Sequence, residues 1–244
     1  MIYRYFLSII LGIIIALSGA VSQADESPSA AEDSGARIAF DLEKWDFGYT
    51  PNRSMVVRSY FIKNTGDDTL RIEKVKPSCG CTSAPLAKDV LPPGDSTELV
   101  VGFKTQRFKG SVEKHIKITS NDPTNPTATI AFTAVVDEDH PSLKAEPNKV
   151  NFVQILEGDK AEREIELTNT TNSKMMLVPV DGPEGDIKFK LKDEKLDPGE
   201  STKIEIEIDK DAKPGLVEGS ITMEVMASAT ARISIPIHAE VIPK

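Results

Sequence analysis

Apolar and polar residues alternate one by one along most of the chain beyond residue 36, and a period of two is that of a β-strand. Two runs show it most clearly, Leu99 to Phe103 and Ala128 to Val136. With an edge strand at Ile38 to Phe40, the pattern predicts about seven short strands in roughly 100 residues, as in a β-sandwich. Turn-forming clusters separate the runs: Asn64-Thr65-Gly66-Asp67-Asp68, Pro92-Pro93-Gly94 and Ser120-Asn121-Asp122-Pro123.

The same pattern is written twice at a constant offset of 105, the difference between Phe47 and Phe152. An unbroken offset of this length predicts two copies of one domain, over 37–138 and 142–244, with His140-Pro141 in a short connector. We therefore predict an all-β chain of two tandem immunoglobulin-like β-sandwich domains. Further matched pairs are Asn64-Thr65 with Asn169-Thr170, Pro93-Gly94 with Pro198-Gly199, Gly110 with Gly215, and Ile130 with Ile235.

The N-terminal segment has a different character. Arg4 is the only charge before Asp25, and Phe6 to Val21 is apolar apart from Gly and Ser. Small residues precede two candidate cleavage points, after Ala20 and after Ala24, which predicts a signal peptide over 1–24 and export to the periplasm or beyond. An uncleaved anchor is the alternative. The apolar run is shorter than the ~20 residues of a membrane helix and no second one follows, so we expect no membrane insertion of the mature chain.

Residues 25–36 read DESPSAAEDSGA, and such a small, acidic segment predicts a disordered spacer. The whole chain has a formal net charge of −9. This sign argues against nucleic acid and against an anionic membrane surface as partners, because both are bound through Lys and Arg.

The one chemical lead is the pair Cys79 and Cys81 in the segment Ser78-Cys79-Gly80-Cys81-Thr82. The spacing suits a local disulfide, binding of a soft metal such as Cu(I), or mixed-disulfide exchange with a partner. The alternative without a chemical function is a disulfide that stays oxidised and inert in an oxidising compartment. A disulfide that closes so short a loop stabilises the fold by only about 1.6 kcal/mol through chain entropy. Stabilisation of the fold is therefore a poor explanation for this cysteine spacing. The second copy has Glu184 and Asp186 at the matching positions.

No other set of residues predicts catalysis, a cofactor or a confident metal site. The three histidines are far apart in sequence and are expected to be surface or satisfied residues. The acidic run Asp137-Glu138-Asp139 is better explained as a solvated linker than as a Ca²⁺ site. Both cysteines lie in one loop, the second copy has none, and Trp45 is expected to precede the second strand. Neither sandwich is therefore expected to have the Cys–Cys bridge packed on Trp that antibody domains share. The histidines are His115, His140 and His238.

Residues 40–136 resemble a widespread bacterial family of exported proteins known only as a domain of unknown function. The resemblance rests on YFIKNTG, LRIEKVKPSCGCT, LPPG and SNDP as they stand in this sequence. The family's fold is similar to the Hydin-like, major-sperm-protein-like and PapD-like sandwiches. It implies an immunoglobulin-like fold and a role in binding or assembly, with no established activity.

Two functions remain open from the sequence. The first is an exported, non-enzymatic binding or scaffold protein of the cell envelope with a protein partner. The alternative is a periplasmic thiol-redox or copper carrier that acts through Cys79 and Cys81.

Overall fold

The computed structural model describes residues 35–183, 185–227 and 229–244. The predicted signal peptide and most of the predicted spacer, 25–36, lie outside these residues. The last two spacer residues, Gly35 and Ala36, are described, and Ala36 is only 3% exposed in the core of the first sandwich. The packed part of the chain therefore includes at least Ala36, which the composition assigned to the spacer.

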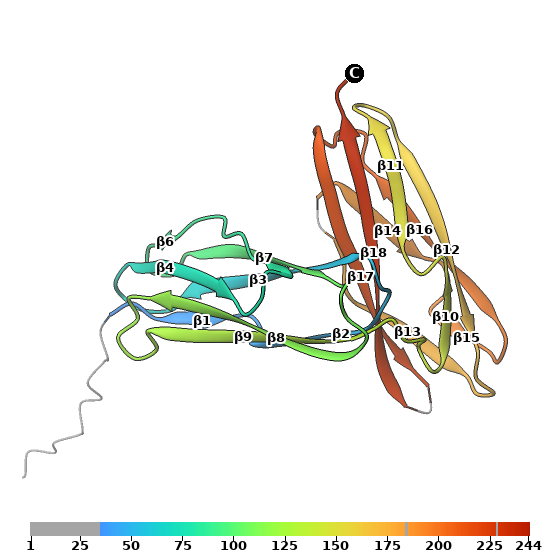
Figure 1. Ribbon diagram of the computed structural model, residues 1–244, viewed down its shortest axis with the longest axis horizontal. Helices are drawn as coiled ribbons and strands as arrows, with labels where there is room; N and C mark the ends of the chain where they lie inside the picture. The colour runs from blue at the N-terminus through green and yellow to red at the C-terminus, as the bar shows by residue number, and fades with distance from the viewer. Residues whose placement is uncertain (1–34, 184, 228) are drawn as a thin grey trace, which may run out of the picture. The chain divides into compact units, whose positions relative to one another are not determined.

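The first sandwich is built from two sheets (Figure 1). Their strands pair antiparallel, except that β2 pairs in parallel with β9. One sheet has the order β1-β3-β7-β5, and the other contains β6-β4-β8-β9-β2. The strands are β1 (Ile38–Phe40), β2 (Lys44–Thr50), β3 (Met55–Asn64), β4 (Leu70–Pro77), β5 (Thr82–Ser83), β6 (Val90–Leu91), β7 (Ser96–Lys104), β8 (Gly110–Ser120) and β9 (Thr127–Val136).

The second sandwich repeats this arrangement. One sheet has the order β10-β12-β16-β14, and the other contains β15-β13-β17-β18 with β11 paired to β18. The strands are β10 (Leu143–Glu146), β11 (Val150–Leu156), β12 (Ala161–Asn169), β13 (Met175–Asp181), β14 (Ile187–Leu191), β15 (Lys195–Leu196), β16 (Ser201–Ile208), β17 (Gly215–Met226) and β18 (Thr230–Ile242).

The predicted fold class, two tandem immunoglobulin-like sandwiches, is confirmed. The sequence analysis did not locate β2 or the two-residue strands β5 and β6; β2 includes Trp45, which the sequence placed before the second strand. A β-bulge between Asp46 and Tyr49 breaks the alternation there, which hides the strand from a period-two search. The described residues contain no helix that is long and apolar enough to cross a bilayer.

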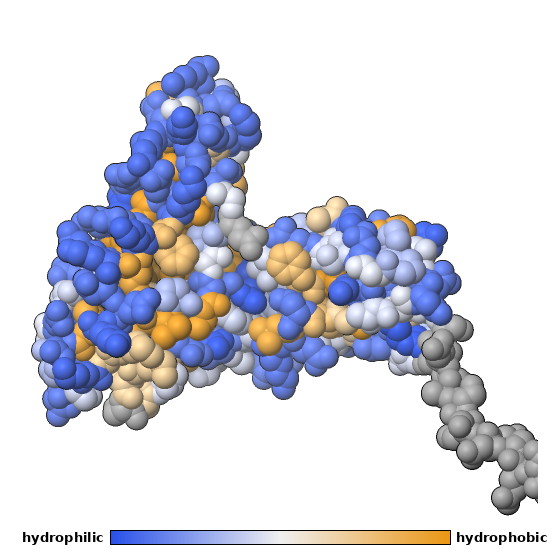
Figure 2. Space-filling model, turned by 180° about the vertical axis from the view of Figure 1, so that it is seen from behind, coloured by the Kyte–Doolittle hydropathy of each residue, from blue (hydrophilic) through white to orange (hydrophobic). Residues whose placement is uncertain are grey.

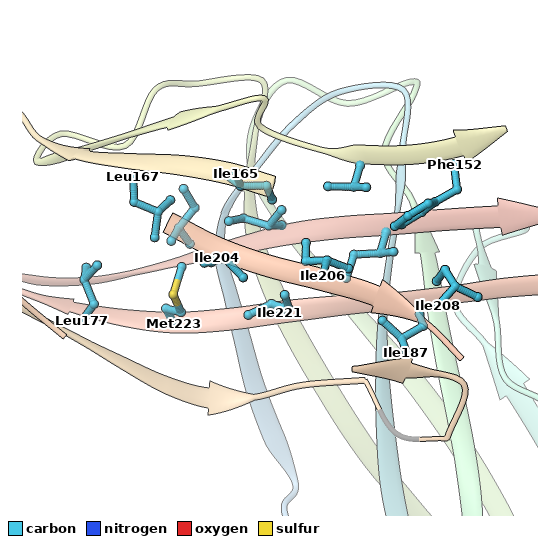
Figure 3. Packing of buried hydrophobic residues seen from close by; sticks show 14 of the residues in the cluster. Phe152, Ile165, Leu167, Leu177, Ile187, Ile204, Ile206, Ile208, Ile221 and Met223 are labelled. Carbon is cyan, nitrogen blue, oxygen red and sulfur yellow. The ribbon is translucent and has the colours of Figure 1, made fainter. Parts of the chain in front are cut away.

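Each sandwich has its own hydrophobic core. In the second core, Ile204, Ile206 and Ile208 of β16 project towards Ile221 and Met223 of β17, and all five are at most 1% exposed (Figure 3). Burying one such side chain stabilises the fold by about 1.5–3 kcal/mol. The surface in Figure 2 is mainly polar with scattered apolar patches, so the alternation seen in the sequence separates core from solvent.

A fully buried asparagine explains the repeated Asn-Thr pair. Asn64 donates from Nδ2 to the carbonyl oxygens of Leu91 (2.9 Å) and Asp68 (2.8 Å). Asn169 does the same in the second copy, to Leu196 (3.2 Å) and Ser173 (2.8 Å). Each side chain gives a donor to one carbonyl of a turn and one carbonyl of a two-residue strand, β6 or β15.

The two sandwiches contact each other through β2 and β3 of the first and β17 and β18 of the second. Strand β2 pairs in parallel with β18 at Tyr49 and Ile233, so one sheet continues through both copies. The Ser234 hydroxyl donates to the Phe47 carbonyl (2.6 Å), and the Ser220 hydroxyl accepts from the Val57 N–H (2.9 Å).

Charged side chains complete this junction. Arg58 forms an ion pair with Asp181 of the second copy, and both side chains are largely buried. The Arg58 guanidinium lies 3.9 Å from the centroid of the Trp45 ring, and that of Arg232 lies 4.7 Å from it. Cations over an indole ring are attracted by its quadrupole, so Trp45 joins a residue of each copy.

Gly48 permits the closest approach at the junction. Its φ is +64°, and a Cβ built on it would overlap the Arg232 carbonyl of β18. Val153 is its counterpart at the offset of 105, with φ +58° and 67% exposure. In both strands a side-chain oxygen accepts the N–H two residues on, from Asp46 to Gly48 (2.9 Å) and from Asn151 to Val153 (2.7 Å). The bulge is therefore a property of the repeat, but only the first copy uses it as a contact.

The pair Gly48 and Val153 gives a matched test. Gly48→Ala should lower the free energy of unfolding by about 2–4 kcal/mol, through overlap with β18 and an unfavourable φ. Val153→Gly puts glycine, which adopts a positive φ without strain, at the matching position of the second copy. The free energy of unfolding should stay the same or rise by up to about 1 kcal/mol. Chemical unfolding followed by the fluorescence of Trp45, the sole tryptophan, measures both. Equal and small effects would show that β2 and β18 do not pack as described.

Candidate functional site

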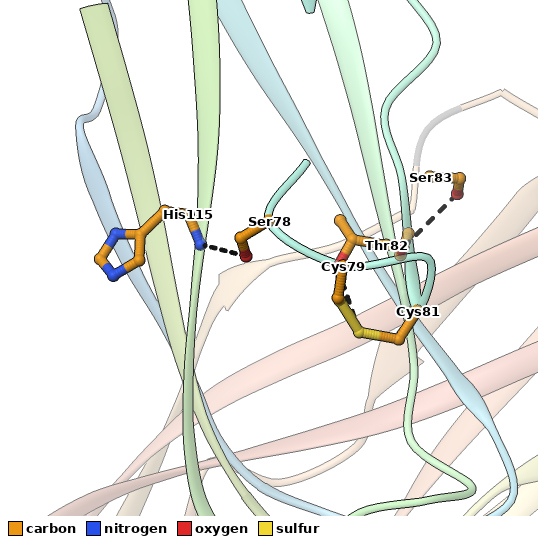
Figure 4. Close-up of a disulfide and its surroundings, with 7 residues drawn as sticks. Ser78, Cys79, Cys81, Thr82, Ser83 and His115 are labelled. Carbon is orange, nitrogen blue, oxygen red and sulfur yellow. Dashed lines mark hydrogen bonds between the residues drawn. A yellow bond between two sulfur atoms is a disulfide. The ribbon is translucent and has the colours of Figure 1, made fainter. Parts of the chain in front are cut away.

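Cys79 and Cys81 form a disulfide in the segment that crosses from one sheet of the first sandwich to the other (Figure 4). The segment follows β4 and precedes β5, and its two α-carbons at Cys79 and Cys81 are 5.2 Å apart. This separation lies within the usual range for a disulfide. The bond thus sits at the point where the chain changes sheets.

Backbone hydrogen bonds hold both ends of this crossover. The Ser78 N–H donates to the His115 carbonyl (2.8 Å), and the His115 N–H donates to the Ser78 hydroxyl (3.2 Å). At the other end the Lys104 N–H donates to the Cys81 carbonyl (2.9 Å). The crossover is therefore fixed to β8 and to β7 independently of the sulfur bond.

The disulfide is partly exposed at the level of whole residues. Both cysteines are half-buried, Cys81 packs against the core, and a Cβ added to the exposed Gly80 would meet nothing within 4 Å. The Thr82 hydroxyl lies 3.5 Å from Cys79 Sγ and 3.9 Å from Cys81 Sγ, and Thr82 is only 7% exposed. One buried hydroxyl thus touches both sulfurs.

The second copy makes the same crossover with neither feature. Thr82 opposes Phe103, and its counterpart Ile187 opposes Ile208 in the same register. Ile187 is buried and apolar. The fold therefore requires neither a disulfide nor a hydroxyl at this place.

Next to the crossover, the outer face of β4, β8 and β9 is basic. Lys76 lies directly opposite Lys117 in the strand register, and Lys74 lies opposite Thr119. Within the described ranges, neither Lys76 nor Lys117 has a carboxylate in ion-pair contact. We call this surface the lysine face and define it by the exposed residues Lys74, Lys76, His115, Lys117 and Thr129; Glu113 borders it, with Oε1 3.8 Å from His115 Nε2.

The corresponding face of the second copy is covered. Ser220, Thr222 and Ser234 stand where the first copy has His115, Lys117 and Thr129, and all three are buried. Two of these hydroxyls bond to β2 and β3 of the first sandwich. The covered face thus has short hydroxyl side chains, and the open face has long cationic ones.

The other sequence candidates do not converge on a site. His115 is exposed, His238 faces Glu218 with 3.3 Å between Nδ1 and Oε1, and His140 is buried in the connector. No group of three or more His, Cys, Asp or Glu side chains in the described part of the chain is arranged to hold a metal. With both sulfurs in a disulfide, Cu(I) binding at Cys79 and Cys81 would require reduction first.

The sequence did not point to the junction cluster of Trp45, Arg58, Asp181 and Arg232, or to the lysine face. A usable signal exists for the face, because the repeat offset aligns lysine and histidine in one copy with serine and threonine in the other. The arginine and aspartate of the junction have no such signal, since only the structure brings them together.

These features define a double immunoglobulin-like sandwich with a disulfide crossover in its first copy. The chain belongs to the family described as "Protein of unknown function (DUF1573)", which matches twice in tandem, over residues 38–136 and 143–241. The resemblance to an exported family of unknown function is confirmed as to family and fold. No match was found among curated proteins.

Several solved structures are similar to the chain. One is a protein of unknown function from Porphyromonas gingivalis W83, 16% identical, covering 83% of this chain and 99% of that one, with a TM-score of 0.37. Others are an ASH/PapD-like domain of human CEP192 (10% identity, 52% and 100% covered, TM-score 0.35) and the periplasmic chaperone SfaE (13% identity, 85% and 100% covered, TM-score 0.30).

His140 provides a pH-dependent prediction. Its Nδ1 accepts the N–H groups of Ser142 and Leu143, both at 3.1 Å. Burial lowers the pKa of His140 from 6.5 to about 4, partly opposed by the backbone of Ala231. Between these values the unfolded chain binds a proton that the folded chain does not, so stability is full above about pH 6.5 and falls towards pH 4 by about 2–3 kcal/mol.

His140→Asn keeps an acceptor for the same N–H groups without titrating, so it should remove most of this loss. Urea unfolding from neutral pH to about pH 4.5 measures it. The exposed His115→Asn is the control and should follow the parent chain. A His140→Asn chain that loses stability as steeply as the parent would contradict the assignment.

Proposed function

We propose that the chain is an exported, non-enzymatic binding or scaffold protein of the cell envelope, and that it binds an acidic protein partner through the lysine face. The observation that carries this proposal is the contrast between the two copies. The face that a sandwich covers in the second copy stands open in the first, with Lys76 and Lys117 in place of Asp181 and Thr222.

Charge supports an acidic partner. Residues 37–138 hold 14 basic and 13 acidic side chains, whereas residues 142–244 hold 14 and 20. The first sandwich is thus the less acidic half of an acidic chain. Like charges directly opposite each other on a sheet are destabilising, and a carboxylate between Lys76 and Lys117 would remove this repulsion.

The arrangement of the remaining polar groups favours binding over catalysis. The histidines lie on separate elements, and the junction polar groups are engaged in holding the two copies together: Ser220 with Val57, Ser234 with Phe47, and Arg58 with Asp181. A non-enzymatic binding role suits this fold, in which two sandwiches are joined through one continuous sheet and the lysine face is left open.

Export is proposed from the sequence of the leader, and it has a direct test. We expect the chain purified from its own cells to begin at Asp25, or at Val21 if cleavage follows Ala20. Cell fractionation and mass measurement of the intact chain would show this. A chain recovered from the cytosol with Met1 and Arg4 still present would contradict export.

Binding through the lysine face predicts a charge-specific loss. A photo-crosslinking residue in place of Thr129 should give a discrete protein adduct in envelope extract. The protein crosslinked to the chain should be rich in Asp and Glu. The double substitution Lys76→Glu with Lys117→Glu should reduce the adduct about tenfold, and added salt should weaken it in the parent chain.

The matched control is Lys63→Glu with Lys109→Glu, which changes the net charge equally at exposed positions outside the lysine face. The adduct should survive in this control. An adduct that both double variants lose equally would reflect net charge alone, and an adduct that neither loses would place the partner elsewhere.

A further inference from the structure

We infer that the Cys79–Cys81 disulfide is a thiol-exchange site that accepts two electrons from an acidic dithiol, with the Thr82 hydroxyl stabilising the sulfur that leaves. This inference goes beyond the scaffold role and does not depend on it. It rests on three features of the first sandwich: a redundant bond, a half-buried disulfide beside a buried hydroxyl, and two lysines without ion-pair partners among the described residues, on the adjoining strands β4 and β8.

The bond contributes little to the fold. A loop of this size gains only about 1.6 kcal/mol of chain entropy from a disulfide. The crossover is already held by Ser78 on β8 and by the Cys81 carbonyl on β7. The second copy makes the same crossover without cysteines. The first sandwich can therefore open this bond and keep its two sheets.

The two sulfurs differ in their surroundings. Cys81 packs against the hydrophobic core of the first sandwich, and Cys79 is not among the side chains that pack there. An incoming thiolate therefore attacks Cys79 Sγ, and Cys81 Sγ is the leaving group. Exchange is faster when the departing thiolate is stabilised.

Thr82 is placed to stabilise that thiolate. Its hydroxyl is 3.9 Å from Cys81 Sγ and 3.5 Å from Cys79 Sγ, so a small rotation lets it donate to whichever sulfur carries the charge. The buried Ile187 of the second copy shows that the fold does not require a hydroxyl here. Thr82 is thus a positioning residue for exchange that can be changed without disturbing the core.

The chemistry balances without a further reagent. One thiolate of the partner forms a bond to Cys79 Sγ, the Cys79–Cys81 bond breaks, and its electron pair stays on Cys81 Sγ. The partner's second thiolate then displaces Cys79 Sγ and closes the partner's own disulfide. The partner loses two electrons and two protons, and Cys79 and Cys81 gain them as thiols.

The lysine face selects the charge of the partner. Lys76 lies three residues before Cys79 and opposite Lys117. His115 is two residues from Lys117 on β8, and its N–H donates to the Ser78 hydroxyl. Neither lysine is neutralised within the described chain. A thiol that carries carboxylates is therefore attracted to the crossover, and a cationic thiol is repelled.

Two small thiols test both parts on the full mature chain. Glutathione is anionic and cysteamine is cationic, and their rates of opening the disulfide are compared at equal thiolate concentration by alkylation and mass measurement. We expect glutathione to react faster than cysteamine. We expect Lys76→Glu with Lys117→Glu to reverse this order, and Lys63→Glu with Lys109→Glu to preserve it.

Thr82→Val removes the hydroxyl at nearly constant volume. It should slow reduction by both thiols about tenfold, which corresponds to about 1.4 kcal/mol in the activation free energy. It should also raise the pKa of the Cys81 thiol in the reduced chain, while the thermal unfolding midpoint stays close to that of the parent. A loss of packing alone would move the unfolding midpoint and leave the thiol pKa unchanged.

The inference is overturned if the disulfide opens only when the chain unfolds, or if Thr82→Val leaves both rate and thiol pKa unchanged. Equal rates for glutathione and cysteamine would overturn the acidic substrate. The variant Cys79→Ser with Cys81→Ser separates this site from the scaffold role. It should abolish exchange and retain the Thr129 adduct, so either function can fail alone.

Discussion

The close backbone contact between β2 and β18 at Gly48 is the constraint on which the arrangement of the two copies depends. Gly48 combines a left-handed φ with a carbonyl of the second copy lying where a side chain would stand. This approach lets one sheet continue from the first sandwich into the second at Tyr49 and Ile233. It also brings Trp45 between the guanidinium groups of Arg58 and Arg232.

The contact divides the surfaces of two similar domains into covered and open ones. On the second copy, β17 and β18 turn small hydroxyls towards the first sandwich, and those hydroxyls bond to its backbone. On the first copy, the same positions point to solvent and hold lysine and histidine. The side chains have diverged according to what faces them, while the inward positions remain apolar in both copies.

The sequence predicted the parts of the fold that depend on local pattern. Alternation along Leu99 to Phe103 located a buried strand, and the fixed offset located its partner in the second copy. It failed at β2, where the bulge at Gly48 replaces alternation with a run that has no clear period. It placed the cysteines in a loop, but their position between two sheets, beside Thr82, depends on strand pairing far along the chain.

Val153 makes the contact of Gly48 unfavourable if it is repeated between molecules. A second molecule that used the same contact would bring the β11 bulge of one chain onto the lysine face of another. A valine would then stand where glycine is needed, and Arg163 would meet Lys76 in place of the Arg58–Asp181 pair. Both contacts are unfavourable, one by overlap and one by repulsion. The contact that joins the two copies is therefore disfavoured between the second sandwich of one chain and the first sandwich of another.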